Sequence, residues 1–177
     1  SSVEKVIEDL RRISEKVKKR TEDVLREAEK ILRRVEKDNK KVNDDARRIV
    51  EELERRGDEK AAREVVKKVE DLLKELKEID EEVARRVRKL VKELKEIHRK
   101  VIEDVRRLVK ELEDEGIEKR LVDRVREAAK DIEDENREVL RRVEEILRRI
   151  EEELKRSSDE TEKAVREIKR RLDERAR

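Results

Sequence analysis

The chain has 177 residues, of which 60% are charged and 33% are hydrophobic, and its formal net charge at pH 7 is only +2. Without cysteine it can form no disulfide and no thiolate metal site, and no stretch approaches the roughly 18 apolar residues that a membrane span requires. The small net charge creates no strong field that would attract nucleic acid or an acidic membrane. We therefore expect no nucleic-acid partner and no membrane partner. We also expect no cofactor. The segment after Ser1 lacks the apolar core of a signal peptide.

Three long helices are predicted from the composition and from the positions of the two glycines. Ala, Glu, Lys, Leu and Arg dominate the chain and proline is absent, a composition typical of long helices. Gly57 and Gly116 lie near one third and two thirds of the length, where a left-handed residue would end a helix. Asp58 is a good N-cap for the second helix, and Ser1 with Glu4 matches a capping box. We predict an all-α single domain over residues 1–177, with helices at about 2–56, 58–115 and 118–176.

Apolar residues recur along the whole second helix at a mean spacing of about 3.6 residues, whereas a left-handed coiled coil repeats every 3.5 residues. Nearly straight helices are therefore expected. The short connections at the glycines predict antiparallel neighbours, and so a long up-down-up three-helix bundle. Flanking residues such as Val66 and Ile102 widen the apolar stripe enough to face two partner helices. The stripe consists of Val65, Val69, Leu72, Leu76, Ile79, Val83, Val87, Leu90, Leu94, Ile97, Val101, Val105, Leu108 and Leu112.

The few uncharged polar residues mostly share a helical phase with apolar residues 18 positions away. Ser14 shares the phase of Leu32, and Asn43 shares that of Leu25. Surface residues would fall on the charged faces instead, so we predict that these side chains occupy core positions. An unpaired amide or hydroxyl there would cost about 1–3 kcal/mol. The candidates are Ser14, Thr21, Asn39, Asn43, His98, Asn136, Ser157, Ser158 and Thr161.

Folding the chain at its two turns places these candidates at two levels. One level is expected to hold Ser14, Thr21, His98 and Asn136, and the other to hold Asn39, Asn43, Ser157, Ser158 and Thr161. We interpret the levels as two hydrogen-bonded networks that cross between helices. Their use would be specificity, because a shifted register or a wrong topology would leave these polar groups without partners. The alternative is that the polar residues are merely tolerated.

Catalysis and metal binding are the functional alternatives for these residues. Ser14, His98 and Asn136 have the residue types of a nucleophile, a base and an orienting partner. A close-packed three-helix core, however, offers neither a substrate cleft nor oxyanion donors. His98 has no second histidine and no cysteine to join it around a metal. We therefore predict that the protein is not an enzyme and has no catalytic, cofactor-binding or metal-ligating residue.

The polar segments that begin at Asn43 and at Ser157 also resemble helix N-caps, so the first and third helices could break there. Against this, the apolar phase continues through both segments without slipping, and neither contains glycine or proline. Continuous helices are therefore predicted.

Taken together, these features resemble de novo designed, parametrically generated helical bundles with buried hydrogen-bond networks. The resemblance covers the whole chain: a core of Ala, Val, Ile and Leu, a surface of Glu, Lys and Arg, polar core residues, and near-equal helices joined at Gly57–Asp58 and Gly116–Ile117. It implies a monomeric structural scaffold with no natural biochemical function and no partner. The alternatives are an open bundle that accepts another helix or a second copy, including a homo-dimer, and a natural spectrin-like coiled-coil spacer, although such repeats generally carry aromatic core residues.

Overall fold

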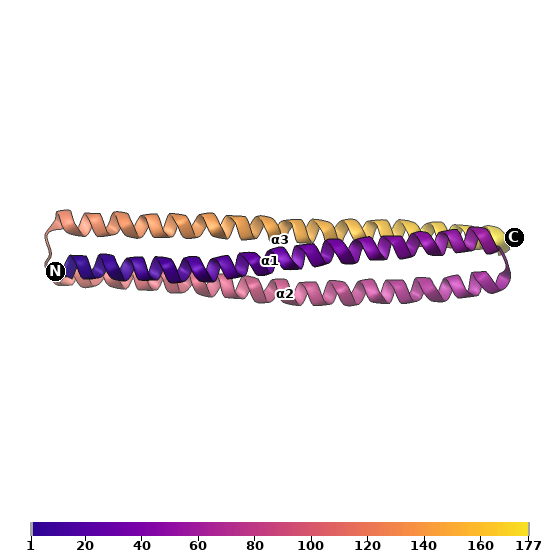
Figure 1. The fold of residues 1–177 in the computed structure, drawn as a ribbon, viewed down its shortest axis with the longest axis horizontal. Coiled ribbons are helices and arrows are strands. Elements are labelled where there is room, and N and C mark those ends of the chain that lie inside the picture. Colours follow the sequence, from indigo (N-terminus) through magenta and orange to yellow (C-terminus); the bar gives the residue numbers. More distant parts are fainter. Residues whose placement is uncertain (1, 177) are drawn as a thin grey trace. The chain divides into compact units, whose positions relative to one another are not determined.

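The computed structural model describes residues 2–176, with the side chains of residues 3–174. Within this range it contains three helices and no strand: α1 (Ser2–Arg56), α2 (Glu59–Asp114) and α3 (Lys119–Ala176) (Figure 1). The predicted all-α fold is confirmed, and α1 and α3 continue unbroken through Asn43 and Ser157. The capping box predicted at Ser1 involves a residue outside the described range.

Both glycines end a helix in the left-handed conformation that the sequence predicts, with φ angles of 66° at Gly57 and 68° at Gly116. Helix α2 begins one residue later than predicted because Asp58 lies outside the helix as its cap. The Asp58 Oδ1 accepts a hydrogen bond from the backbone amide of Ala61 at 2.6 Å. Helix α2 also ends one residue earlier, at Asp114, because the next two residues form the turn, and α3 begins at 119 instead of 118.

Contacts divide the chain into two compact units, and each unit contains a segment of every helix. Unit 1 comprises Ser1–Glu29 and Val87–Ile146, and unit 2 comprises Lys30–Arg86 and Leu147–Arg177. The predicted polar levels follow this division: the residues of the first level belong to unit 1, and those of the second belong to unit 2. The single-domain organisation of the chain stays a prediction.

Contacts between side chains give the helix directions within each unit. In unit 2, residue numbers fall along α2 as they rise along α1, in the ion pairs Arg34–Glu82 and Lys41–Glu75. They rise together along α1 and α3, in the pairs Glu36–Arg149 and Glu54–Arg171. In unit 1, α2 and α3 run in opposite directions, as shown by the contacts of Glu113 with Arg126 and of His98 with Asn136. These directions are those of an up-down-up three-helix bundle.

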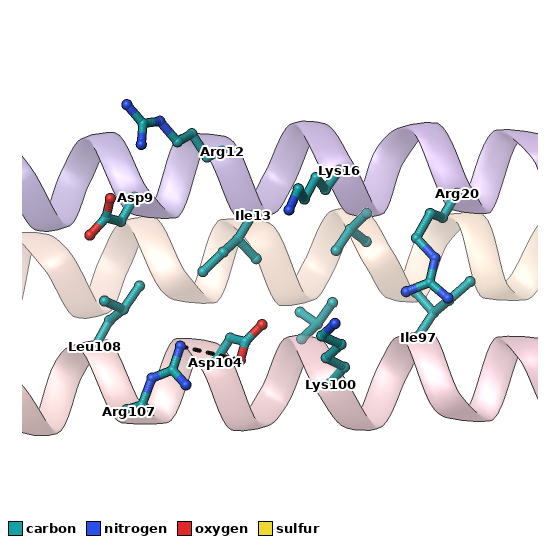
Figure 2. A pocket seen from close by; sticks show the side chains of 12 residues that line it. Asp9, Arg12, Ile13, Lys16, Arg20, Ile97, Lys100, Asp104, Arg107 and Leu108 are labelled. Carbon is teal, nitrogen blue, oxygen red and sulfur yellow. Dashed lines mark ion pairs between the residues drawn. The ribbon is translucent and has the colours of Figure 1, made fainter.

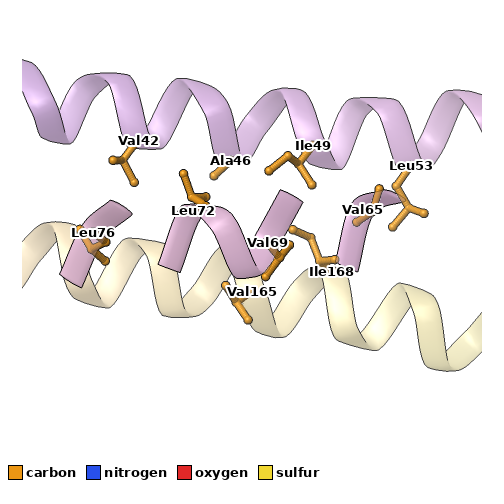
Figure 3. Close-up of a cluster of buried hydrophobic side chains, with 10 residues drawn as sticks. All are labelled: Val42, Ala46, Ile49, Leu53, Val65, Val69, Leu72, Leu76, Val165 and Ile168. Atoms are coloured by element: carbon orange, nitrogen blue, oxygen red, sulfur yellow. The ribbon is translucent and has the colours of Figure 1, made fainter. Parts of the chain in front are cut away.

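The core of unit 2 is a cluster of aliphatic side chains that all three helix segments supply (Figure 3). Leu72 from α2 and Ile168 from α3 lie within it, only 5% and 2% exposed. Spacing of three and four residues places the α1 and α2 members on one face of each helix. The cluster consists of Val42, Ala46, Ile49, Leu53, Val65, Val69, Leu72, Leu76, Val165 and Ile168.

Unit 1 buries the same residue types in the same way. Buried side chains come from α1, from α2 and from α3, including Leu10, Val24, Leu94, Val101, Val125 and Val143. Not all apolar residues of α2 are covered by the other two helices in unit 2. Val66 and Leu73 are 43% and 40% exposed. These two residues therefore present apolar surface on the outer side of α2.

Candidate functional site

In unit 1, the predicted polar residues His98 and Asn136 meet across the space between α2 and α3. Asn136 is buried, and its Nδ2 lies 3.0 Å from Nδ1 of the half-buried His98. With the ring proton on Nε2, His98 Nδ1 accepts a hydrogen bond from the Asn136 amide. The other amide atom, Asn136 Oδ1, is buried without a hydrogen-bond partner among the described residues.

The other two candidates of unit 1 lie on α1, where Thr21 bonds within its own helix. The Thr21 hydroxyl donates to the carbonyl oxygens of Val17 at 2.8 Å and Lys18 at 3.0 Å, a common arrangement for threonine inside a helix. Ser14 is half-buried, and it lines a groove of about 270 Å³ between α1 and α3 together with Thr21 and Asn136. These residues thus line one groove, whereas the direct contact between helices is the pair of His98 and Asn136.

In unit 2, two asparagines of α1 donate hydrogen bonds to α3. The Asn39 amide is buried, and its Nδ2 donates to the backbone carbonyl oxygen of Glu153 at 2.9 Å. One turn along, the half-buried Asn43 donates through Nδ2 to Oε2 of Glu160 at 2.7 Å. The acceptors Glu153 and Glu160 are charged residues, so the pattern of uncharged polar residues does not indicate them. Their positions do indicate them: Glu153 lies four residues before Ser157 and Glu160 three residues after it, so both are on the same face of α3 as Ser157.

The hydroxyls of α3 are buried, but they do not complete a network. Ser157 and Thr161 are each 1% exposed, and neither hydroxyl has a hydrogen-bond partner among the described residues. The carbonyl that Ser157 could reach in its own helix, four residues back, is that of Glu153, which already accepts from Asn39. Ser158 is half-buried beside them. The hydrogen bonds between α1 and α3 are therefore made by the side-chain amides of Asn39 and Asn43. The hydroxyls of Ser157 and Thr161 are buried but take no part in them.

Asp80 of α2 is a half-buried acidic residue with one buried carboxylate oxygen. Its Oδ1 is buried without a hydrogen-bond partner among the described residues, and burial raises the pKa of its carboxyl group. Asp80 and His98 are 18 residues apart and therefore lie on the same face of α2. The spacing of apolar residues places this face at the edge of the core. The ionised form of Asp80 is therefore less favourable in the folded chain than in the unfolded chain.

We expect Asp80→Asn to stabilise the chain at neutral pH and to lose this advantage in acid. The folded-state pKa of Asp80 lies above its ordinary value of 3.8, so its destabilising effect is complete above the folded pKa and disappears as the pH falls below the unfolded value. Urea denaturation from pH 7 to pH 3 measures the difference in free energy of unfolding between variant and parent. Glu167, whose pKa Arg170 and Arg171 lower to about 2, contributes with the opposite sign but cancels in this difference. Asp159→Asn, at an exposed position, is the control, and an equal, pH-independent effect of both changes would contradict the assignment.

The described part of the chain shows no group of three or more His, Cys, Asp or Glu side chains placed to hold a metal ion. None of its helices combines the length and the apolar character needed to cross a bilayer. What the arrangement does provide is directional contact between helices: an amide to a ring nitrogen in unit 1, and amides to a carbonyl and a carboxylate in unit 2.

Comparison with known proteins identifies the fold. No protein-family model matches the chain, and no curated protein matches it. Among solved structures, a computationally designed three-helix bundle is similar, with a TM-score of 0.50, 18% sequence identity, and coverage of 99% of this chain and 82% of that one. At this identity the likeness concerns the fold. The resemblance to designed helical bundles noted from the sequence is thus confirmed at the level of the fold.

Proposed function

We propose that the chain is a designed structural scaffold without catalytic activity, in which polar contacts between helices specify the register of the bundle. The observation that carries this proposal is the hydrogen bond from Asn39 Nδ2 on α1 to the Glu153 carbonyl on α3, at 2.9 Å. The likeness to a computationally designed three-helix bundle supports the scaffold role. The contact between Asn136 and His98 supplies a second directional constraint, in unit 1.

The physical reason is that an aliphatic core tolerates sliding better than an amide does. Val, Leu, Ile and Ala make non-directional contacts, and a helix that slides by two turns, about 11 Å, again presents apolar side chains to its neighbours. The same slide would separate Asn39 from its carbonyl acceptor and leave a buried donor unpaired, at a cost of about 1–3 kcal/mol. Each polar contact thus penalises wrong registers more than it stabilises the right one.

We expect the scaffold to be monomeric in solution. Light scattering coupled to size-exclusion chromatography should give the mass of one chain, and this mass should stay constant as the protein concentration rises about a hundredfold. A dimer mass, or a mass that rises with concentration, would contradict the monomeric scaffold.

An assembly component is the second candidate function, and one observation favours it: Val66 and Leu73 expose apolar surface on the outer side of α2. Apolar residues on an uncovered helix face can contact a further helix or a second copy. In that case Val66→Glu with Leu73→Lys would convert the larger species to monomer. If the parent is already monomeric, and the double variant has the same mass and melting temperature, this second candidate is rejected.

A further inference from the structure

A groove of about 310 Å³ lies between α1 and α2 in unit 1, and it is large enough for a small ligand (Figure 2). Its volume falls at the lower end of the range of about 300–1,000 Å³ that is usual for ligand pockets. Ile13 and Val17 of α1 are only half-buried, so their hydrocarbon is accessible along the groove. The apolar lining consists of Ile13, Val17, Ile97, Val101 and Leu108.

The rim of this groove is predominantly basic. Among the described residues, five cations line it against two carboxylates, Asp9 and Asp104. Arg107 pairs with Asp104 at 3.5 Å and Arg12 pairs with Glu8 at 3.4 Å. Glu96, whose pKa is lowered chiefly by Arg99, also interacts with Arg20 and Lys100. The cations are Arg12, Lys16, Arg20, Lys100 and Arg107. The groove therefore combines accessible hydrocarbon with an excess of cations over carboxylates among its lining residues.

Two other grooves of similar size lack this combination. In the groove of unit 1 between α1 and α3, the described lining residues include two cations, Lys18 and Arg142, and two carboxylates, Glu135 and Glu138, so its charges balance. In the groove of unit 2 between α1 and α2, of about 280 Å³, carboxylates outnumber cations among the described residues, with Asp45, Glu52, Asp71 and Glu75 against Arg48 and Lys68. An anion would therefore be attracted to the first groove, neither attracted nor repelled by the second, and repelled by the third.

We propose that the basic groove of unit 1 binds a free, monomeric fatty acid of medium chain length, with its hydrocarbon on the floor and its carboxylate at Lys16, Arg20 and Lys100. The floor buries methylene groups, and each additional methylene strengthens binding about fourfold while the groove has room. The exposed cations attract the carboxylate, and salt screens this attraction. The site is independent of the scaffold role, which requires no ligand.

Isothermal titration of the full chain with octanoate, decanoate and dodecanoate, each below its micelle concentration, tests the proposal at low ionic strength. We expect one site per chain, with affinity rising from octanoate to dodecanoate and falling as salt is added. In the triple variant Lys16→Gln, Arg20→Gln, Lys100→Gln the affinity should fall about tenfold, as loss of three exposed charges implies. The matched control Lys19→Gln, Lys95→Gln, Arg106→Gln removes the same charge from exposed positions outside the groove and should bind like the parent.

The location is tested by the backbone amide signals of isotopically labelled protein. Saturating decanoate should shift the signals around Ile13 and Val101, and leave those around Ile49 and Leu72 in the acidic groove unchanged. The proposal is overturned if the two triple variants bind equally, if dodecyltrimethylammonium binds as tightly as dodecanoate, or if no ligand binds at millimolar concentration. It is also overturned if the chain binds only vesicles of anionic phospholipid, since that result would assign the basic rim to a membrane surface.

Discussion

Replacing Leu72 with alanine is expected to lower the free energy of unfolding by about 2–5 kcal/mol, because it removes a large side chain from a filled core. Leu72 is 5% exposed and contacts the aliphatic cluster of unit 2 (Figure 3). The next residue, Leu73, is 40% exposed on the same helix. Leu73→Ala should therefore change the free energy of unfolding by less than about 0.5 kcal/mol.

The two substitutions form a matched pair, since both exchange leucine for alanine in the interior of α2 and so have the same helix propensity term. Guanidinium denaturation followed by circular dichroism gives both values. Because Leu72 is buried and Leu73 is exposed, the loss in free energy of unfolding should be clearly larger for Leu72→Ala than for Leu73→Ala. Equal costs would mean that Leu73 is covered in solution, which is the outcome that an assembly through the outer side of α2 would produce.

The Asn39→Asp substitution should destabilise the chain by about 3–5 kcal/mol at pH 8, which is typical of a buried charge without a partner. Asn39 is 4% exposed, and its amide donates to the Glu153 carbonyl. A carboxylate at this position cannot donate, and it would face that carbonyl oxygen and the Glu153 carboxylate. The substitution thus converts an attraction between α1 and α3 into a repulsion.

The pH dependence of this variant separates charge from shape. Burial would raise the folded-state pKa of the introduced carboxyl group above its unfolded value of about 4. The destabilisation should therefore be complete above the folded pKa, shrink as the pH falls from the folded pKa toward about 4, and be absent below about 4. Asn39→Leu, which introduces no charge, is the control and should show no such pH dependence relative to the parent. If Asn39→Asp and Asn39→Leu have the same stability at pH 8, Asn39 is not buried against Glu153 in solution.

Much of the fold could be predicted because it is specified by local chemistry. Gly57 and Gly116 end their helices in the left-handed conformation, and Asp58 caps the next helix through its side chain. The helical spacing of Val, Leu and Ile determines which face of each helix is buried, as with Leu72 and Ile168. Each of these features depends on a few consecutive residues or on one period, so the sequence is sufficient to find it.

The partners of the polar residues could not be predicted in the same way. The phase of Asn39 and Asn136 indicates burial, and both are buried, but phase does not say whether an amide meets a side chain or a backbone carbonyl. The acceptor for Asn39 is the carbonyl of Glu153, a group that every residue carries. Thr21 satisfies its hydroxyl within α1, an outcome that depends on its rotamer. The charge of Asp80 is typical of a surface residue, although its Oδ1 is buried.

The central claim is that polar contacts between helices specify the register, and the triple variant Asn39→Leu, Asn43→Leu, Asn136→Leu tests it most directly. Spin labels attached to cysteines introduced at the exposed positions Lys37 on α1 and Lys155 on α3 report the register of unit 2 through their distance distribution.

In the parent, electron paramagnetic resonance should give one narrow distribution of distances between the two labels. In the triple variant we expect thermal stability to be equal or higher, because hydrocarbon replaces amides whose oxygens, Asn39 Oδ1 and Asn136 Oδ1, are buried without a partner among the described residues. At the same time we expect the distance distribution to broaden or divide into two populations and the mass to become heterogeneous. A triple variant that remains monodisperse, with the same single narrow distribution as the parent, would contradict the claim that these contacts specify the register.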